Sequence, residues 1–397
     1  MTESEIPVVR LGPGRHKRPA AGYPWIYSNE IVMDAAAKAL PAGAVVRIAA
    51  AGGELLGTAM FNPKPLISAR MLSRDPAAVI DADFIAARLA AALALRERLY
   101  PGGAYRLIHA EADGLPGLVI DRFGDALAVQ ANTAGMDRLE PELLAALERV
   151  VRPRLVVMRN DSPARAAEGL GQDVRAAKGT LNGMVEFVEN GLSFRADLRG
   201  GQKTGWFFDQ RENRAAVAAL AAGRRVLDLY SYGGGFALAA AKAGAASVVA
   251  VDSSAPALAL AADAAERNGL AATCSFRRAE AFAELARLAA AGERFGVVIA
   301  DPPAFVKSKK DLAAGARGYR KLARLAASVV EPGGVLFIAS CSHNVDVPLF
   351  AEQVRRGLDD AHRTGRILRT SGAAADHPVH PHLPETAYLK GQLIALD

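Results

Sequence analysis

"RRVLDLYSYGGGF", residues 224–236, is the most informative stretch of this chain for its architecture. An apolar run typical of a buried strand leads into three consecutive glycines, and an alanine-rich helical pattern follows them directly. Glycine lets a backbone turn sharply and approach a ligand at a helix N-terminus. The stretch therefore predicts a strand, a ligand-binding turn and a helix of an α/β domain.

The same alternation of strand and helix continues to the C-terminal part of the chain. Apolar strand patterns recur at 247–252, 273–279, 295–301 and 333–341, and helical patterns separate them. This order predicts a doubly wound parallel sheet with helices on both faces, in a Rossmann-like domain at 189–397. Ligands of such sheets bind at the carboxyl ends of the strands.

Two smaller domains are predicted before this one. Residues 1–74 contain short β-type runs between glycine and proline turns, which indicates a small β-barrel or sandwich. Residues 75–188 begin with an amphipathic helix at 81–100 and continue with a hairpin around 121–125. They predict a compact α+β linker domain without evident chemistry of its own.

Length and composition restrict the class of protein. At 397 residues the chain exceeds one ordinary domain, and its net charge of +6 permits a polyanionic partner such as nucleic acid. Its two cysteines, Cys274 and Cys341, give no disulfide framework and no metal-ligand spacing. With neither a signal-peptide pattern nor an apolar run of membrane-spanning length, we expect a soluble cytoplasmic protein.

Acidic residues follow the predicted strands at positions that suit a nucleoside. Asp252 ends the second strand, where a carboxylate can accept hydrogen bonds from ribose hydroxyls. The glycine spacing is not GxGxxG, which favours S-adenosylmethionine over a nicotinamide cofactor because S-adenosylmethionine has no pyrophosphate. Glu280 follows the third strand, either as an acceptor for an adenine amino group or as a helix N-terminal charge.

Two further segments complete the predicted site. "DPPAFVKS", residues 301–308, forms a stiff turn that can hold a planar base while Asp301 contacts its polar edge. In "QKTGWFFDQRENR", residues 202–214, Lys203 and Arg211 can bind a cofactor carboxylate between aromatic walls at 207–208. Asp209 can cap the helix that follows, and the two interpretations of this segment can both hold.

A basic turn in the first domain predicts contacts with RNA. Arg15, Lys17 and Arg18 surround a turn in "RLGPGRHKR" and precede Trp25, a combination suited to phosphate contacts and base stacking. A solvated turn followed by core aromatics is the alternative. The three histidines of "HPVHPH", residues 377–382, are separated by prolines and show no carboxylate or thiol partner, so no metal site is expected.

Taken together, "KTGWFFDQRENR", "DLYSYGGGF", "DPPAFVKSKKDL", "SCSHN" and "ADHPVHPHLPETAYLKG" resemble class I S-adenosylmethionine-dependent methyltransferases. More closely, the chain resembles the bacterial ribosomal large subunit methyltransferase I family, which makes 5-methylcytosine in 23S rRNA. The resemblance implies S-adenosylmethionine as cofactor, 23S ribosomal RNA as partner and an N-terminal PUA domain. The cofactor-binding residues implied or predicted are Lys203, Thr204, Phe208, Gln210, Arg211, Tyr232, Gly234, Gly235, Asp252, Glu280 and Asp301. This family commonly has Asp where Glu280 stands and Gly where His343 stands.

Cys341 is the predicted nucleophile of such a reaction. A thiolate that adds to C6 of cytosine makes C5 able to attack a sulfonium methyl group, and Asp301 can assist by hydrogen bonding at N3. The serines beside Cys341 and its place after a strand indicate exposure, whereas a buried strand-end thiol is the alternative. Cys274, on a predicted interior strand, is expected to pack in the core.

Two other functions remain open at this point. The first is a methyltransferase that acts on guanine or on an exocyclic amine without a covalent step. The second is a non-catalytic RNA-binding protein.

Overall fold

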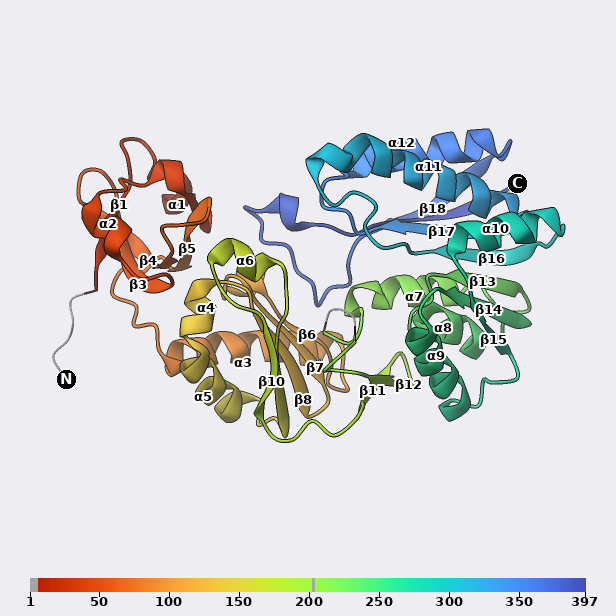
Figure 1. Cartoon of the computed structure of the whole chain (residues 1–397), viewed down its shortest axis with the longest axis horizontal. Coiled ribbons are helices and arrows are strands. Elements are labelled where there is room, and N and C mark those ends of the chain that lie inside the picture. Colours follow the sequence, from red (N-terminus) through yellow and green to blue (C-terminus); the bar gives the residue numbers. More distant parts are fainter. Residues whose placement is uncertain (1–5, 202–203) are drawn as a thin grey trace. The chain divides into compact units, whose positions relative to one another are not determined.

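The computed structural model describes residues 6–201 and 204–397 (Figure 1). The chain forms two compact units. The first comprises the described residues up to Val185 with the segments Asp197–Trp206 and Asp376–Pro384; the second comprises Glu186–Ala196, Phe207–Ala375 and Glu385–Asp397. Among the described residues no helix has both the length and the apolarity needed to cross a membrane.

The first unit begins with a small β-rich fold, as the short β-type runs predict. Its sheet has the strand order β1-β3-β4-β5-β2. The strands are β1 Val8–Arg10, β2 Trp25–Tyr27, β3 Ala44–Ala49, β4 Leu55–Phe61 and β5 Ile67–Ser73. The short helices are α1 Lys17–Ala20 and α2 Ala35–Ala39, with a 3-10 turn at Ser28–Glu30. Alternating side chains of β3, among them Val46 and Ile48, are fully buried and form its core.

The rest of the first unit is the predicted α+β fold. Its sheet has the order β10-β9-β8-β7-β6, and β7 and β8 form the predicted hairpin. The strands are β6 Ala104–His109, β7 Leu118–Phe123, β8 Ala126–Ala131, β9 Leu155–Asn160 and β10 Asp173–Lys178. The helices are α3 Ala82–Leu99, α4 Ala134–Arg138, α5 Glu140–Val150 and α6 Ala164–Glu168. Asp81 caps α3 by accepting from the backbone N–H groups of Asp83 and Phe84.

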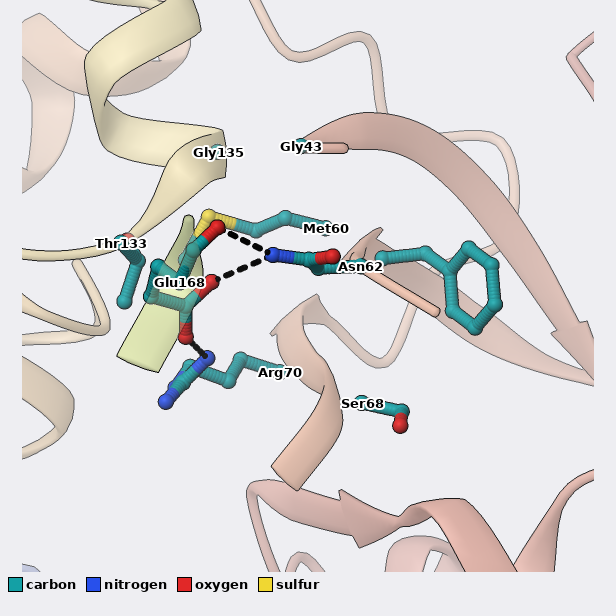
Figure 2. A pocket seen from close by; sticks show the side chains of 9 residues that line it. Gly43, Met60, Asn62, Ser68, Arg70, Thr133, Gly135 and Glu168 are labelled. Carbon is teal, nitrogen blue, oxygen red and sulfur yellow. Dashed lines mark hydrogen bonds and ion pairs between the residues drawn. The ribbon is translucent and has the colours of Figure 1, made fainter. Parts of the chain in front are cut away.

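A buried carboxylate joins the two folds of the first unit (Figure 2). Glu168 at the end of α6 accepts from Arg70 Nη1 at 2.6 Å, from Asn62 Nδ2 at 2.9 Å and from the Ala134 N–H at 3.3 Å. Arg70 lies on β5, whereas Ala134 begins α4. The Glu168 carboxylate thus accepts hydrogen bonds from donors in both folds. The small pocket lined by Asn62, Arg70 and Glu168 is therefore interpreted as a structural contact between the two folds and not as a ligand site.

The second unit contains the predicted doubly wound sheet. Its strand order is β15-β14-β13-β16-β17-β19-β18, in which the first five strands are parallel. These are β13 Arg225–Leu229, β14 Ser247–Asp252, β15 Cys274–Arg278, β16 Phe295–Ala300 and β17 Val330–Ser340. The last two strands, β18 Gly365–Ser371 and β19 Lys390–Leu396, pair antiparallel and were not predicted. The sheet is therefore mixed at one edge.

Helices cover both faces of this sheet (Figure 1). One face carries α7 Arg211–Ala218, α8 Gly235–Lys242 and α9 Ala255–Arg267. The other carries α10 Ala281–Ala290, α11 Leu312–Ser328 and α12 Val347–Asp360. A separate hairpin is formed by β11 Val185–Glu189 and β12 Leu192–Ala196. Strand order reverses between β13 and β16, and the loops after these two strands are where a ligand is expected in such a sheet.

Candidate active site

The loop after β13 has a strained backbone. Tyr230 has φ 61° and Tyr232 has φ 47°, values that residues with a side chain rarely adopt. Gly234 follows with φ 79°, and a Cβ there would lie 2.8 Å from Leu238 and 2.9 Å from Ala261. Strained backbone conformations of this kind are common at ligand-binding sites. Gly234 is required here both for its positive φ and because a side chain would clash with Leu238 and Ala261.

Asp228 lies inside β13 and was not among the predicted site residues. It is 1% exposed, and its Oδ2 atom accepts from the Ala237 N–H at 3.0 Å. Burial raises its pKa to about 8, and the neighbouring Asp301 carboxylate adds to the rise. Within residues 6–201 and 204–397, Asp228 Oδ1 and Ser231 Oγ are buried without a hydrogen-bond partner. The only signal in the sequence was an acid within an apolar strand.

The structure brings together Asp252 and Tyr232, two residues of the predicted cofactor site. Asp252 ends β14, and its two oxygens accept from the Tyr232 N–H at 2.9 Å and from the Ser254 N–H at 2.8 Å. The Asp252 carboxylate, at the end of the neighbouring strand β14, thereby holds the strained loop in place. The ring of Phe207 contacts the ring of Tyr232 edge-on, with centroids 5.2 Å apart. The loop is thus held by a carboxylate and an aromatic ring.

Gly235 begins α8 and leaves room for an arginine. A Cβ at this position would lie 2.5 Å from Nε of Arg214, a residue that was not predicted to contribute. Arg214 is buried on α7, where it donates to Glu189 at 2.6 Å and to the Phe207 carbonyl at 2.9 Å. The glycine therefore permits a buried ion pair directly beneath the loop.

The predicted residues at 203–211 have different surroundings. Lys203 lies outside the described residues. The buried hydroxyl of Thr204 donates to Asp121 in the first unit. In the second unit, Phe208 is buried edge-on against Phe187, with centroids 5.8 Å apart. Gln210 Oε1 accepts from Asn213 at 2.6 Å, and Arg211 lies 3.5 Å from the Glu189 carboxylate.

The expected helix cap by Asp209 is wrong. Helix α7 begins after Gln210, which makes no side-chain cap hydrogen bond. The Asp209 carboxylate instead accepts from the hydroxyl of Tyr388. A long-range partner has displaced the local one, because Tyr388 is brought here by the C-terminal segment.

Glu280 precedes α10 at the N-cap position. Its side chain is exposed and makes no cap hydrogen bond. Burial raises the pKa of Tyr230, and the Glu280 carboxylate raises it further, so the two side chains act on each other electrostatically. Glu280 therefore lies near the strained loop, at the N-terminus of α10.

Cys341 directly follows β17, which pairs with β16, so the two predicted motifs meet at one sheet edge. Its half-buried thiol donates to the Pro302 carbonyl at 3.8 Å. Asp301, the residue before that proline, is also half-buried. The sheet thus brings the predicted nucleophile to the Asp-Pro-Pro turn.

The serines beside Cys341 were an argument for exposure of its thiol, but Ser340 and Ser342 are fully buried and Cys341 is half-buried. Ser342 Oγ accepts from the Val306 N–H at 3.2 Å and pairs with the Tyr319 hydroxyl at 2.8 Å. These hydroxyls tie the cysteine loop to the Asp-Pro-Pro loop, so they are used for packing rather than for solvation.

Cys274 lies on an edge strand rather than an interior one. β15 is the outermost strand of the sheet on its side, and Cys274 is half-buried there. Burial raises the pKa of its thiol to about 11. The residue is therefore a poorly ionised thiol.

The basic residues of the predicted RNA-binding turn are exposed, but two of the predicted RNA-binding side chains also have internal partners. Arg15 and Lys17 are exposed. The Arg18 guanidinium lies 3.8 Å from the ring centroid of Tyr23. Trp25 Nε1 donates to Glu111 at 2.8 Å, which gives the indole a structural role.

The histidine segment differs from its prediction in one respect. His377 Nδ1 pairs with Asp376 Oδ1 at 2.7 Å, and both residues are buried, so a carboxylate partner is present. Asp376 also accepts from the Arg106 N–H at 2.9 Å. Across the part of the chain that the structure describes, no three His, Cys, Asp or Glu side chains form a metal-ligand group.

Comparisons with known proteins show the family to which the chain is similar. Residues 154–383 match the S-adenosylmethionine-dependent methyltransferase family, and residues 9–74 match the PUA-like domain. The chain is 39% identical to "Ribosomal RNA large subunit methyltransferase I" of Photobacterium profundum, over 96% of this chain and 98% of that protein. It is 37% identical to the protein of the same name from Erwinia tasmaniensis, over 96% and 97% respectively.

Solved structures show the same fold. The structure of SMU.776 in complex with SAH is similar with a TM-score of 0.83 and 22% identity. The likeness covers 98% of this chain and 100% of that chain. The likeness therefore extends to the folds of both units, and not only to the sheet of parallel strands.

Proposed function

This chain belongs to the ribosomal RNA large subunit methyltransferase I family of S-adenosylmethionine-dependent methyltransferases, and on that basis we propose that it methylates carbon 5 of a cytosine in 23S rRNA. The observation that carries the proposal is the approach of the Cys341 thiol to the Asp-Pro-Pro turn, 3.8 Å from the Pro302 carbonyl. A thiol beside a turn that can hold a base is what covalent catalysis at a pyrimidine requires.

The loop after β13 fits the cofactor. Asp228 Oδ1 and Ser231 Oγ, two buried polar atoms without partners among residues 6–201 and 204–397, are available to polar groups of a ligand. The Asp252 carboxylate is oriented by two backbone N–H groups and keeps lone pairs for ribose hydroxyls. Bound S-adenosylmethionine supplies an electrophilic methyl group on a sulfonium. Arg211, Gln210, Gly234, Gly235 and Glu280 belong to the proposed cofactor site as well.

Cys341 and Asp301 carry the proposed chemistry. The Cys341 thiolate forms a bond to C6 of cytosine, and the electron pair of the C5–C6 double bond becomes available at C5. C5 would then accept the methyl group that bound S-adenosylmethionine supplies, and the electron pair of the broken methyl–sulfonium bond would stay on the cofactor sulfur. Loss of the C5 proton to a base restores the double bond and expels the thiolate. Asp301, when its carboxyl is protonated, donates a hydrogen bond to N3 and so helps the ring accept the electron pair.

The first part of the chain supplies the proposed RNA contacts. We assign residues 1–74 as a PUA-like RNA-binding domain, residues 75–188 as a linker domain and residues 189–397 as the methyltransferase domain. Arg15, Lys17 and Arg18 provide positive charge for phosphates. The target nucleotide must leave its stack to reach a cysteine at a sheet edge.

Methyl transfer from tritium-labelled cofactor to 23S rRNA tests the proposal. We expect label in 5-methylcytidine after nucleoside digestion, and its loss in Cys341→Ala with cofactor binding unchanged. Label in a purine, or full transfer by Cys341→Ala, would instead favour a methyltransferase that works without a covalent step. The Cys274→Ala variant is the matched control, and we expect it to keep its activity.

A further inference from the structure

Lys390 is a buried lysine that the proposed mechanism does not yet use. It begins β19, where it is 4% exposed and pairs across the antiparallel ladder with Ser340 of β17. Its ammonium donates to the Ser342 carbonyl at 2.7 Å. The two residues it contacts are those on either side of Cys341, so the lysine lies against the cysteine loop.

The electrostatics of this position favour an anion. Burial lowers the pKa of Lys390, while the Cys341 sulfur and the Asp346 carboxylate act in the opposite direction. Asp346 is exposed and is already used as the cap of α12, where it accepts from the Leu349 N–H at 2.8 Å. An ionised Cys341, on the loop whose Ser342 carbonyl the ammonium contacts, is a second counter-charge beside Asp346.

The other titratable groups near the cysteine loop have other roles. Tyr319 of α11 pairs with the Ser342 hydroxyl, and burial raises its pKa, which keeps the phenol neutral. The exposed His343 contacts the ring of Tyr388, with centroids 5.3 Å apart. Asp301 follows the neighbouring strand β16, and its carboxyl group supplies no positive charge to a thiolate. Unlike Tyr319, His343 and Asp301, Lys390 is therefore a buried cation beside the cysteine loop that can stabilise ionised sulfur.

We propose that Lys390 is a positioning residue of the methyl transfer, whose buried ammonium holds the Cys341 sulfur as a thiolate and fixes its loop through the Ser342 carbonyl. This inference rests on the proposed role of Cys341 as the nucleophile. Lys390 gives up no proton in the reaction. The thiolate leaves its ammonium partner when it bonds to C6 and regains that partner when it is expelled, so the lysine also makes sulfur a better leaving group.

The ionisation of Cys341 tests this directly in a Cys274→Ser background, in which Cys341 is the one thiol of the chain. The rate of alkylation by iodoacetamide is measured against pH. We expect a midpoint below the ordinary cysteine value of about 8.5. We expect Lys390→Met to raise it by about 1–2 pH units, the shift an adjacent opposite charge produces. Lys390→Arg should restore most of the shift.

The matched control is Lys242→Met. The ammonium of Lys242 on α8 also donates to a backbone carbonyl, that of Asn190 at 2.9 Å, but it is exposed. We expect no change in the Cys341 midpoint there. Equal midpoints in the parent protein and in folded Lys390→Met would show that the lysine serves structure alone.

A parent midpoint at or above the ordinary cysteine value would overturn the proposal without any lysine variant. The measurement does not depend on methyl transfer. If Cys341→Ala retained activity, the proposed function would fail while the test of the Lys390–Cys341 pair would still stand.

Discussion

Replacing Asp252 with asparagine tests how the strained loop is held. The carboxylate accepts from the Tyr232 N–H at 2.9 Å through one oxygen and from the Ser254 N–H at 2.8 Å through the other. An asparagine has the same shape but only one accepting oxygen. One of these two backbone donors therefore loses its acceptor in Asp252→Asn.

The expected magnitude follows from that lost bond. An unpaired buried donor costs about 1–3 kcal/mol, and because Asp252 is only half-buried the lower part of this range applies, about 1–2 kcal/mol. Tyr230 and Tyr232 have positive φ values, and without this hydrogen bond the loop relaxes toward less strained conformations. The fraction of molecules whose loop can bind cofactor therefore falls. At about 1.4 kcal/mol per factor of ten, affinity falls roughly 5- to 30-fold.

Isothermal titration with S-adenosylhomocysteine is the assay. Asp263→Asn is the matched control, because Asp263 lies on α9 of the same unit and pairs with surface arginines such as Arg267, at 2.8 Å. We expect the control to bind as the parent does. A dissociation constant for Asp252→Asn within twofold of the parent would contradict this view of the loop.

Three further predictions concern stability. Gly235→Ala places a Cβ 2.5 Å from Arg214 Nε and should lower the free energy of unfolding by about 1–3 kcal/mol, measured by chemical denaturation. Asp228 has a folded pKa of about 8, so ionising it opposes folding, and parent stability should fall between pH 5 and pH 8; Asp228→Asn should lose less over that window. Glu168→Gln breaks the buried pair with Arg70, 2.6 Å long, and should destabilise the first unit by about 3 kcal/mol.

Each of these has its own control or contrary result. Gly372→Ala, in the same unit as Gly235 and with 3.6 Å to its nearest neighbour, should be neutral; an equal loss at both glycines would contradict the steric argument. If the free energy of unfolding of the parent and of Asp228→Asn depended on pH in the same way, the pKa of the Asp228 carboxyl would not differ between the folded and unfolded protein, which would contradict this prediction. Glu54→Gln, at an exposed carboxylate of the first unit, should leave the melting curve unchanged, unlike Glu168→Gln.

The parts of the fold that local pattern determines could be predicted from the sequence. Apolar runs and glycine turns located β13 to β17, because parallel buried strands are continuously apolar. The meeting of Cys341 with Pro302 also followed, since parallel strands present their carboxyl ends at one edge. The contact between Tyr232 and Asp252, which were predicted separately for the cofactor site, has the same origin.

Features that depend on distant pairing could not be predicted. β18 and β19 join the sheet antiparallel, and only that register buries Lys390 beside Ser340. The partner of Arg214 is Glu189, on a hairpin far from α7 in sequence, and nothing local marks either residue. The serine on each side of Cys341 indicated solvent exposure in the sequence, but both serines are buried. The Ser342 hydroxyl joins the cysteine loop to the Asp-Pro-Pro loop, because a hydroxyl can hydrogen bond to backbone groups in the interior.

The most direct test of the covalent mechanism uses 23S rRNA that carries 5-fluorocytosine, whose C5 fluorine cannot leave as a proton does. After methyl transfer the C6–sulfur bond then persists, and the protein–RNA adduct is visible by denaturing electrophoresis. We predict an adduct with the parent protein in the presence of S-adenosylmethionine and none with Cys341→Ser. Methylation of ordinary rRNA without any adduct on the fluorinated RNA would contradict the account.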